Sequence, residues 1–284
     1  MTDGDSAIDL AVDATFQLDL FVRTAWHGLD FAAHSTRVVK TLADYRNQTR
    51  QDASPPHPTP EELERAAKLE AFAAEQLPYF PFLHSLATFR LWAILEAGVE
   101  DWLRELLAIH PEMWERPRFA QLEGALVPFG LAAPHQQAEI LFDGLKERLA
   151  AQLKIGVGRF ETLLDACGIG GGVCDVVRRI ILELVEVRNI VAHRNGKADE
   201  RFLQQCPWFA GANDQTILVT QLHFQRYVTA VHWYLVELSR RYLALNPASE
   251  VDAPKRLADK RDLLDFLEAK LQQMEQSLSE HGTT

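Results

Sequence analysis

Three polar residues, Arg188, Asn189 and His193, close a segment that is otherwise among the most apolar in the chain. A guanidinium holds anions in a planar fork, and an imidazole exchanges protons near neutral pH. Burying an arginine without a partner costs free energy, so Arg188 either pairs with an internal carboxylate or faces a cavity that receives an anion. Three glutamates are candidates for such a pair: Glu96, Glu183 and Glu186. In that structural reading His193 caps a helix C-terminus, where the helix dipole favours it.

Helical geometry limits how these side chains can meet. At about 100° per residue, Asn189 and His193 share a helix face, whereas Arg188 and His193 lie about 140° apart around the axis and about 7.5 Å along it. One copy of the chain makes a compact pair only if the helix ends or unwinds at Ala192. Two copies packed about a two-fold axis would bring two arginines and two histidines into one cleft.

The charge distribution indicates where a polyanion would bind. The formal net charge of −11 argues against nonspecific binding of nucleic acid to the chain as a whole. Residues 178–201, however, hold six basic and four acidic residues, which gives +2 here and −13 elsewhere. The six basic residues are Arg178, Arg179, Arg188, Arg194, Lys197 and Arg201. A chance fluctuation in composition explains the same local excess equally well.

The elements that position these residues are helices, because apolar residues recur at spacings of three and four almost throughout the chain. This periodicity predicts an all-α fold. A first amphipathic helix is expected over 8–46, and the four prolines of 51–60 form the clearest linker. A capping box of Thr59 and Glu62, with Pro60 between them, predicts that a helix starts there and runs to about residue 77.

The following helices form the predicted core. Helices are expected over 82–109, 135–167 and 222–245, and another begins at Val173 and carries the polar motif. Asn195 and Gly196 supply the stop signal of that helix. The glycine cluster at 168–172 lacks the Gly-Lys-Ser/Thr ending of a phosphate-binding loop and no strand precedes it, which favours a turn between two helices.

The C-terminal segment differs in kind, because its leucines follow an alternating three and four spacing over about two heptads. It either dimerises or docks on its own domain. The predicted organisation is a long N-terminal helix (1–50), a proline-rich linker (51–60), a helical core (61–247) and a C-terminal heptad-like helix (254–284).

The stretch from Glu186 to Gly196 (EVRNIVAHRNG) resembles the Arg-x4-6-His signature of the HEPN superfamily, in its Arg-Asn-x-x-x-His form. The segment LWAILE, which ends at Glu96, is similar to an earlier HEPN core helix that often carries a glutamate near the arginine. The resemblance covers roughly 80–245. It implies an up-and-down helical bundle of HEPN type, with an N-terminal helical extension and a C-terminal amphipathic helix.

The resemblance also implies a metal-independent endoribonuclease that works as a homodimer, of the kind found in toxin–antitoxin and phage-defence systems. His193 would move protons, Arg188 would hold the scissile phosphate, and Asn189 would orient either of them. Arg194, Lys197 and Arg201 would guide the RNA backbone, and Glu96 would support the arginine. Expected products are a 2′,3′-cyclic phosphate and a 5′-OH, and an antitoxin or other defence protein is a possible partner.

One position departs from the family pattern. HEPN toxins paired with a nucleotidyltransferase antitoxin usually carry a tyrosine two residues after the histidine, and this chain has Asn195 there. Control by that route is therefore not expected. The main rival to the nuclease is a non-catalytic helical module for dimerisation or partner binding, in which Arg188 and His193 are structural and the heptad tail binds the partner.

Other classes of site and location are disfavoured. The cysteines (Cys167, Cys174 and Cys206) are odd in number and lack ligand spacing, and the histidines are scattered, so neither a metal nor another cofactor is expected. The acidic N-terminus does not resemble a signal peptide, and no apolar run approaches the roughly 18 residues of a membrane span. We therefore expect a cytoplasmic protein.

Overall fold

The computed structural model describes residues 6–49, 58–77, 81–120, 122, 126–152, 154–209, 215–245 and 252–281. Over these residues the chain is all-α, as predicted, and its only strand-like feature there is an isolated bridge between Lys197 and Thr216. The longest helices are α1 (Ala7–Ala32), α4 (Pro81–Ile109), α9 (Asp175–Arg194), α11 (Gln221–Leu245) and α12 (Ala253–His281). Within the same ranges, no helix combines the length and the apolar character needed to cross a bilayer.

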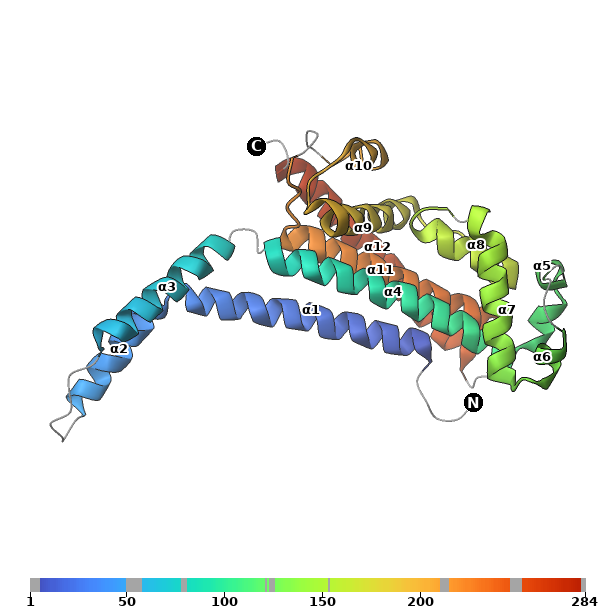
Figure 1. Cartoon of the computed structure of the whole chain (residues 1–284), viewed down its shortest axis with the longest axis horizontal. Helices are drawn as coiled ribbons and strands as arrows, with labels where there is room; N and C mark the ends of the chain where they lie inside the picture. The colour runs from blue at the N-terminus through green and yellow to red at the C-terminus, as the bar shows by residue number, and fades with distance from the viewer. Residues whose placement is uncertain are drawn as a thin grey trace.

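Helix α4 lies at the centre of the molecule, where α1, α9 and α11 all pack against it (Figure 1). Its Leu91, Leu95 and Leu103 are fully buried, because apolar residues cover several of its faces. Helix α12 packs on α11 and α9 and buries Leu264 and Leu271. The C-terminal heptad segment therefore packs on its own chain, which is one of the two roles expected from its sequence.

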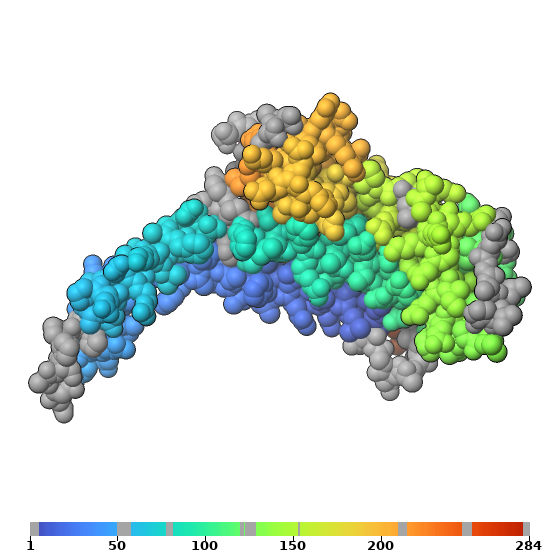
Figure 2. Space-filling view, in the orientation of Figure 1, coloured from blue at the N-terminus to red at the C-terminus, as the bar shows by residue number. Residues whose placement is uncertain are grey.

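The N-terminal segment forms two helices instead of one. Helix α1 ends at Ala32, the chain turns at 33–34, and α2 (Ser35–Gln48) follows. The Ser35 hydroxyl donates to the carbonyl of Ala32, which takes up a helix-end acceptor at the turn. Helix α2 packs with α3 (Pro60–Gln76) in a helical hairpin that projects from the body (Figures 1 and 2).

The start of α3 confirms the predicted capping box. The Glu62 amide donates to the Thr59 hydroxyl (3.2 Å), and the Thr59 amide donates to the Glu62 carboxylate (2.8 Å). Most of the proline-rich linker, 51–57, lies outside the described residues, as does the Asn246-Pro247 stop after α11.

The segment after α4 is made of short elements and two longer helices. The short elements are η1 (Pro111–Glu115), α5 (Pro117–Ala120), α6 (Leu126–Leu131) and η2 (Ala150–Gln152). Where one helix was expected over 135–167, the structure has α7 (Pro134–Leu149) and α8 (Val157–Cys167). The break falls at Gly156, whose φ of 63° is unfavourable for other residues. A Cβ there would also lie 3.2 Å from the backbone of Leu182.

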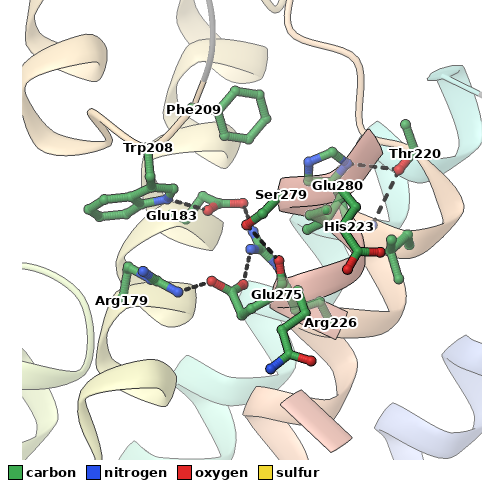
Figure 3. Close-up of a pocket in the computed structure, with 13 residues that line it drawn as sticks. Arg179, Glu183, Trp208, Phe209, Thr220, His223, Arg226, Glu275, Ser279 and Glu280 are labelled. Atoms are coloured by element: carbon green, nitrogen blue, oxygen red, sulfur yellow. Dashed lines mark hydrogen bonds and ion pairs between the residues drawn. The ribbon is translucent and has the colours of Figure 1, made fainter. Parts of the chain in front are cut away.

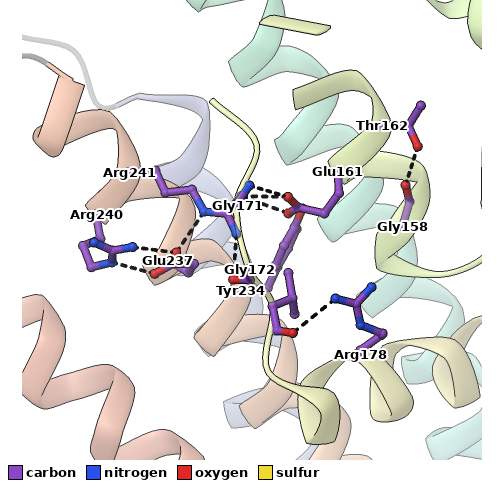
Figure 4. Close-up of polar contacts among 11 residues, drawn as sticks. Gly158, Glu161, Thr162, Gly171, Gly172, Arg178, Tyr234, Glu237, Arg240 and Arg241 are labelled. Carbon is purple, nitrogen blue, oxygen red and sulfur yellow. Dashed lines mark hydrogen bonds and ion pairs between the residues drawn. The ribbon is translucent and has the colours of Figure 1, made fainter. Parts of the chain in front are cut away.

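The glycine cluster between α8 and α9 is a turn between two helices, held in place by buried polar side chains (Figure 4). Glu161 accepts hydrogen bonds from the Gly171 amide (3.0 Å), the Tyr234 hydroxyl (2.7 Å) and the Arg241 guanidinium (2.9 Å). Arg241 also donates to the Gly172 carbonyl (3.1 Å). The turn thereby fixes where α9 begins, and so where its last residues lie.

Candidate functional site

The predicted motif lies in the last two turns of α9, and the end of this helix is well defined. Asn195 adopts a left-handed conformation (φ 52°, ψ 40°) and the amide of Gly196 donates to the carbonyl of Ile190 (3.0 Å). This arrangement is a glycine-assisted helix C-cap, as the Asn-Gly pair predicted. Beyond it, the isolated bridge from Lys197 to Thr216 ties the turn to the segment before α11.

Arg188 is half-buried and lies against α4. Its guanidinium donates to the Asn189 side-chain oxygen (3.1 Å), and its Cζ atom lies 5.5 Å from the centroid of the Phe89 ring. The Nε atom is buried and has no hydrogen-bond partner among the described residues. The cation is therefore held in place by an amide and an aromatic face.

The three glutamates considered as partners of Arg188 all pair with other arginines. Glu96 bonds Arg159 (2.7 Å), Glu183 bonds Arg226, and Glu186 lies 3.6 Å from Arg201. Within the described ranges, Arg188 makes no ion pair. Of the two roles considered for Arg188, the internal ion pair is therefore not formed within those ranges.

His193 is exposed, one turn beyond Asn189. Helix α9 stays regular through Arg194, so it does not unwind at Ala192. In a single copy, Arg188 and His193 therefore remain about 140° apart around the helix axis. The structure brings Arg188 and Asn189 into contact and leaves His193 on a different side of the helix from Arg188.

The cations expected to guide RNA cluster around the turn between α9 and α10 (Glu200–Gln205). Arg194, Lys197 and Arg201 are all exposed. Arg194 lies 3.8 Å from Asp199, and Arg201 makes the distant contact with Glu186. Burial raises the pKa of Glu186, which Arg201 opposes. Both ion pairs are long, and both guanidiniums are exposed.

An exposed apolar stripe runs along α4 beside Arg188. It consists of Phe82 (72% exposed), Leu86 (50% exposed), the half-buried Phe89 and the exposed Ala93. Their spacing of four, three and four residues places them on one helix face. We call these four residues the α4 stripe. Phe89 belongs both to the stripe and to the contact with Arg188, so the two features are continuous.

A polar pocket that sequence reasoning did not find lies nearer the start of α9 (Figure 3). At its base Glu183 is fully buried and accepts hydrogen bonds from the Trp208 indole (2.6 Å) and the Tyr227 hydroxyl (2.7 Å). Arg226 bonds both Glu183 and Glu275. The sequence signal was a glutamate, Glu183, among the apolar residues of α9, but its partners come from α11 and from the loop after α10.

No protein-family model, curated protein or solved structure is detectably similar to this chain.

Proposed function

We propose that the chain is a HEPN-type, metal-independent endoribonuclease that acts as a homodimer in toxin–antitoxin or phage defence. The observation that carries the proposal is Arg188. It is half-buried, it has no carboxylate partner among the described residues, and Asn189 and Phe89 hold it beside an exposed surface. A permanent cation in that state is suited to hold a phosphate group.

In the proposed reaction, the ribose 2′-oxygen attacks the adjacent phosphorus and gives its proton to a neutral imidazole of His193. The bond from phosphorus to the 5′-oxygen breaks, and that oxygen takes up a proton from an imidazolium. Arg188 stabilises the negative charge on the phosphate oxygens in the transition state, with Asn189 orienting the guanidinium. The products are a 2′,3′-cyclic phosphate and a 5′-OH.

The α4 stripe supports the homodimer. Contiguous exposed apolar side chains on one helix face, such as these four, commonly mark a surface that another protein covers. A two-fold axis passing near this stripe would place the Arg188 of each copy close to the partner copy. The separation of Arg188 from His193 within one copy is the reason that two copies are needed.

The test incubates purified wild type, Arg188→Ala and His193→Ala with mixed RNA in EDTA. His193→Ala removes the proton-transfer group and should slow cleavage about 10²–10⁴-fold. Arg188→Ala removes the cation that holds the phosphate and should slow it about 10²–10³-fold. His27→Ala is the matched control, because His27 is also exposed but lies on α1, and it should cleave like wild type. DNA of the same sequence should stay intact, since it lacks the 2′-OH.

The opposing result is an inert wild type, or cleavage that persists in both variants with the helical circular dichroism spectrum intact. Such a result would favour the alternative, a non-catalytic module for dimerisation or partner binding. One observation favours that alternative: α9 is unbroken through Arg194, so Arg188 and His193 stay apart in one copy.

A further inference from the structure

The pocket of Figure 3 has a volume of about 790 Å³, within the usual range for small-molecule sites. Its sides come from α9, the loop after α10, the start of α11 and the last turns of α12. Four of its lining residues are apolar: Trp208, Phe209, Leu222 and Leu278. The pocket is thus large enough for a planar ring system and has the walls to stack on one.

The base of the pocket is held rigid by linked ion pairs. Glu275 of α12 forms ion pairs with both Arg179 and Arg226. Arg226 forms a second ion pair with the buried Glu183. Glu183 also accepts a hydrogen bond from the Nε1 atom of Trp208. The tryptophan ring is therefore fixed before any ligand arrives, which lowers the entropic cost of binding.

The aromatic side chains are placed as a stacking surface. The rings of Phe209 and His223 stack with centroids 5.2 Å apart, and the Arg179 guanidinium lies 5.6 Å from the Trp208 ring. Burial lowers the pKa of His223 to about 4, so its ring is neutral at pH 7. Trp208 remains 38% exposed, which leaves part of its ring open to a ligand.

The charge of the lining decides which part of a nucleotide fits. The lining holds three carboxylates (Glu183, Glu275 and Glu280) and two guanidiniums (Arg179 and Arg226), which gives it a formal charge of −1. This net charge repels a phosphate, whereas an uncharged ring is not repelled. These features favour a nucleobase and disfavour a phosphate inside the pocket.

We propose that this pocket binds a base of the RNA substrate and so contributes to the choice of cleavage site. The proposal rests on the ribonuclease function proposed above. Glu183 and His193 are ten residues apart on one helix, about 15 Å along its axis and about 80° apart around it. A base in the pocket therefore belongs to a nucleotide near the scissile phosphate and not to the one that is cut.

Binding to RNA that stays uncut tests the proposal separately from cleavage. The His193→Ala chain is titrated with fluorescein-labelled hexamers of A, C, G or U and with an abasic hexamer of equal phosphate count. At least one base hexamer should bind about ten-fold more tightly than the abasic one, the gain expected of one stacked base. Adding Trp208→Ala should remove that difference, and Trp208→Phe should keep most of it.

Two further variants make the outcome decisive. Leu278→Trp fills the pocket from the α12 side and should cause the same loss as Trp208→Ala, even if the latter folds poorly. Phe266→Ala, which removes an exposed aromatic ring that does not line the pocket, should change nothing. Equal binding of base and abasic hexamers, or a base preference that survives both pocket variants, would overturn the proposal. An inert wild type in the cleavage assay would instead contradict the ribonuclease.

Discussion

His223 and His232 of α11 lie where burial keeps their imidazoles neutral. Burial is the main cause that lowers the pKa of each ring to about 4. The His232 ring packs 4.3 Å from Phe16 of α1, and its Nε2 atom is buried without a hydrogen-bond partner among the described residues. Protonating either histidine in the folded protein would therefore place a charge in a poorly solvated position.

The pH dependence of stability follows from these two rings. Unfolded histidine titrates near pH 6.5, so below that pH the unfolded chain binds protons that the folded chain does not. The free energy of unfolding should fall as the pH drops from about 6.5 to about 4, by at most about 1.4 kcal/mol per pH unit for each histidine. Above pH 7 these groups should cause no change.

His232→Phe isolates one contribution, because it removes one buried imidazole and leaves every other titratable group of the chain in place. Urea unfolding at pH 7.5 and pH 5 should show a smaller loss of stability in the variant than in wild type. Equal losses would mean that His232 titrates alike in the folded and unfolded chains.

The surroundings of Arg188 could be anticipated only in part from the sequence. An arginine at the end of an apolar helix predicted either an ion pair or an anion site, and both readings named Glu96. The structure pairs Glu96 with Arg159 of α8 and places Phe89 against Arg188. Those contacts depend on how α4, α8 and α9 cross, which local residue patterns do not encode.

At the scale of the elements, the crossing of α1 and α4 is unusually close. A Cβ atom added to Gly98 of α4 would lie 2.5 Å from the Cβ of Ala11 in α1. Gly98 therefore lets the two helices approach, and a larger residue there must push α1 away or distort α4.

Gly98→Ala should lower the free energy of unfolding by about 1–2 kcal/mol, because overpacking outweighs the better helix propensity of alanine. Ala11→Gly alone should cost about 1 kcal/mol. The double variant should return to within about 1 kcal/mol of wild type, since the new methyl group then fills the space left by the old one. Urea denaturation of all four proteins measures this cycle.

Gly28→Ala in α1, the helix that carries Ala11, is the control, because nothing lies within 4 Å of a Cβ at that position. It should leave stability unchanged or raise it by up to about 1 kcal/mol. If the free energy of unfolding lost in the double variant equals the sum of the two single losses, the result would argue against a close crossing of α1 and α4.

Helix ends differ in how well the sequence predicts them. Thr59 and Asn195 act through hydrogen bonds within a few residues, so their capping motifs could be recognised directly. The break at Gly156 was missed because single glycines also occur inside helices, and only its positive φ separates the two cases. The turn at 33–34 contains neither glycine nor proline and carries no comparable signal.

At the scale of the whole molecule, the α4 stripe makes the dimer testable. Leu86→Glu places a charge in the proposed interface and should convert a dimer into a monomer in sedimentation experiments. Because the proposed site needs both copies, RNA cleavage should fall about 10²-fold or more with it. Leu42→Glu is the matched control, since Leu42 is equally exposed (52%) but lies on α2 in the projecting hairpin.

A Leu86→Glu monomer that cleaves RNA at the wild-type rate would contradict a composite site. A variant that still sediments as a dimer would place the interface elsewhere on the molecule.

The fold class was predictable, whereas the long-range arrangement was not. Apolar spacings of three and four residues along nearly every segment specify helices. The same spacings in the C-terminal segment suited both a second copy and the chain's own core, and packing against α11 and α9 decides between them. The projection of the α2–α3 hairpin likewise depends on tertiary contacts.

The position of α1 has a consequence for how the protein is made. This helix emerges from the ribosome early, yet it packs on α4 and on α11, whose last residue is Leu245. At about 5–20 residues per second, synthesis of the intervening chain takes on the order of ten to forty seconds. Until α11 is complete, the part of α1 that packs on α11 lacks its partner, so a nascent-chain chaperone that shields it should raise the yield of folded protein.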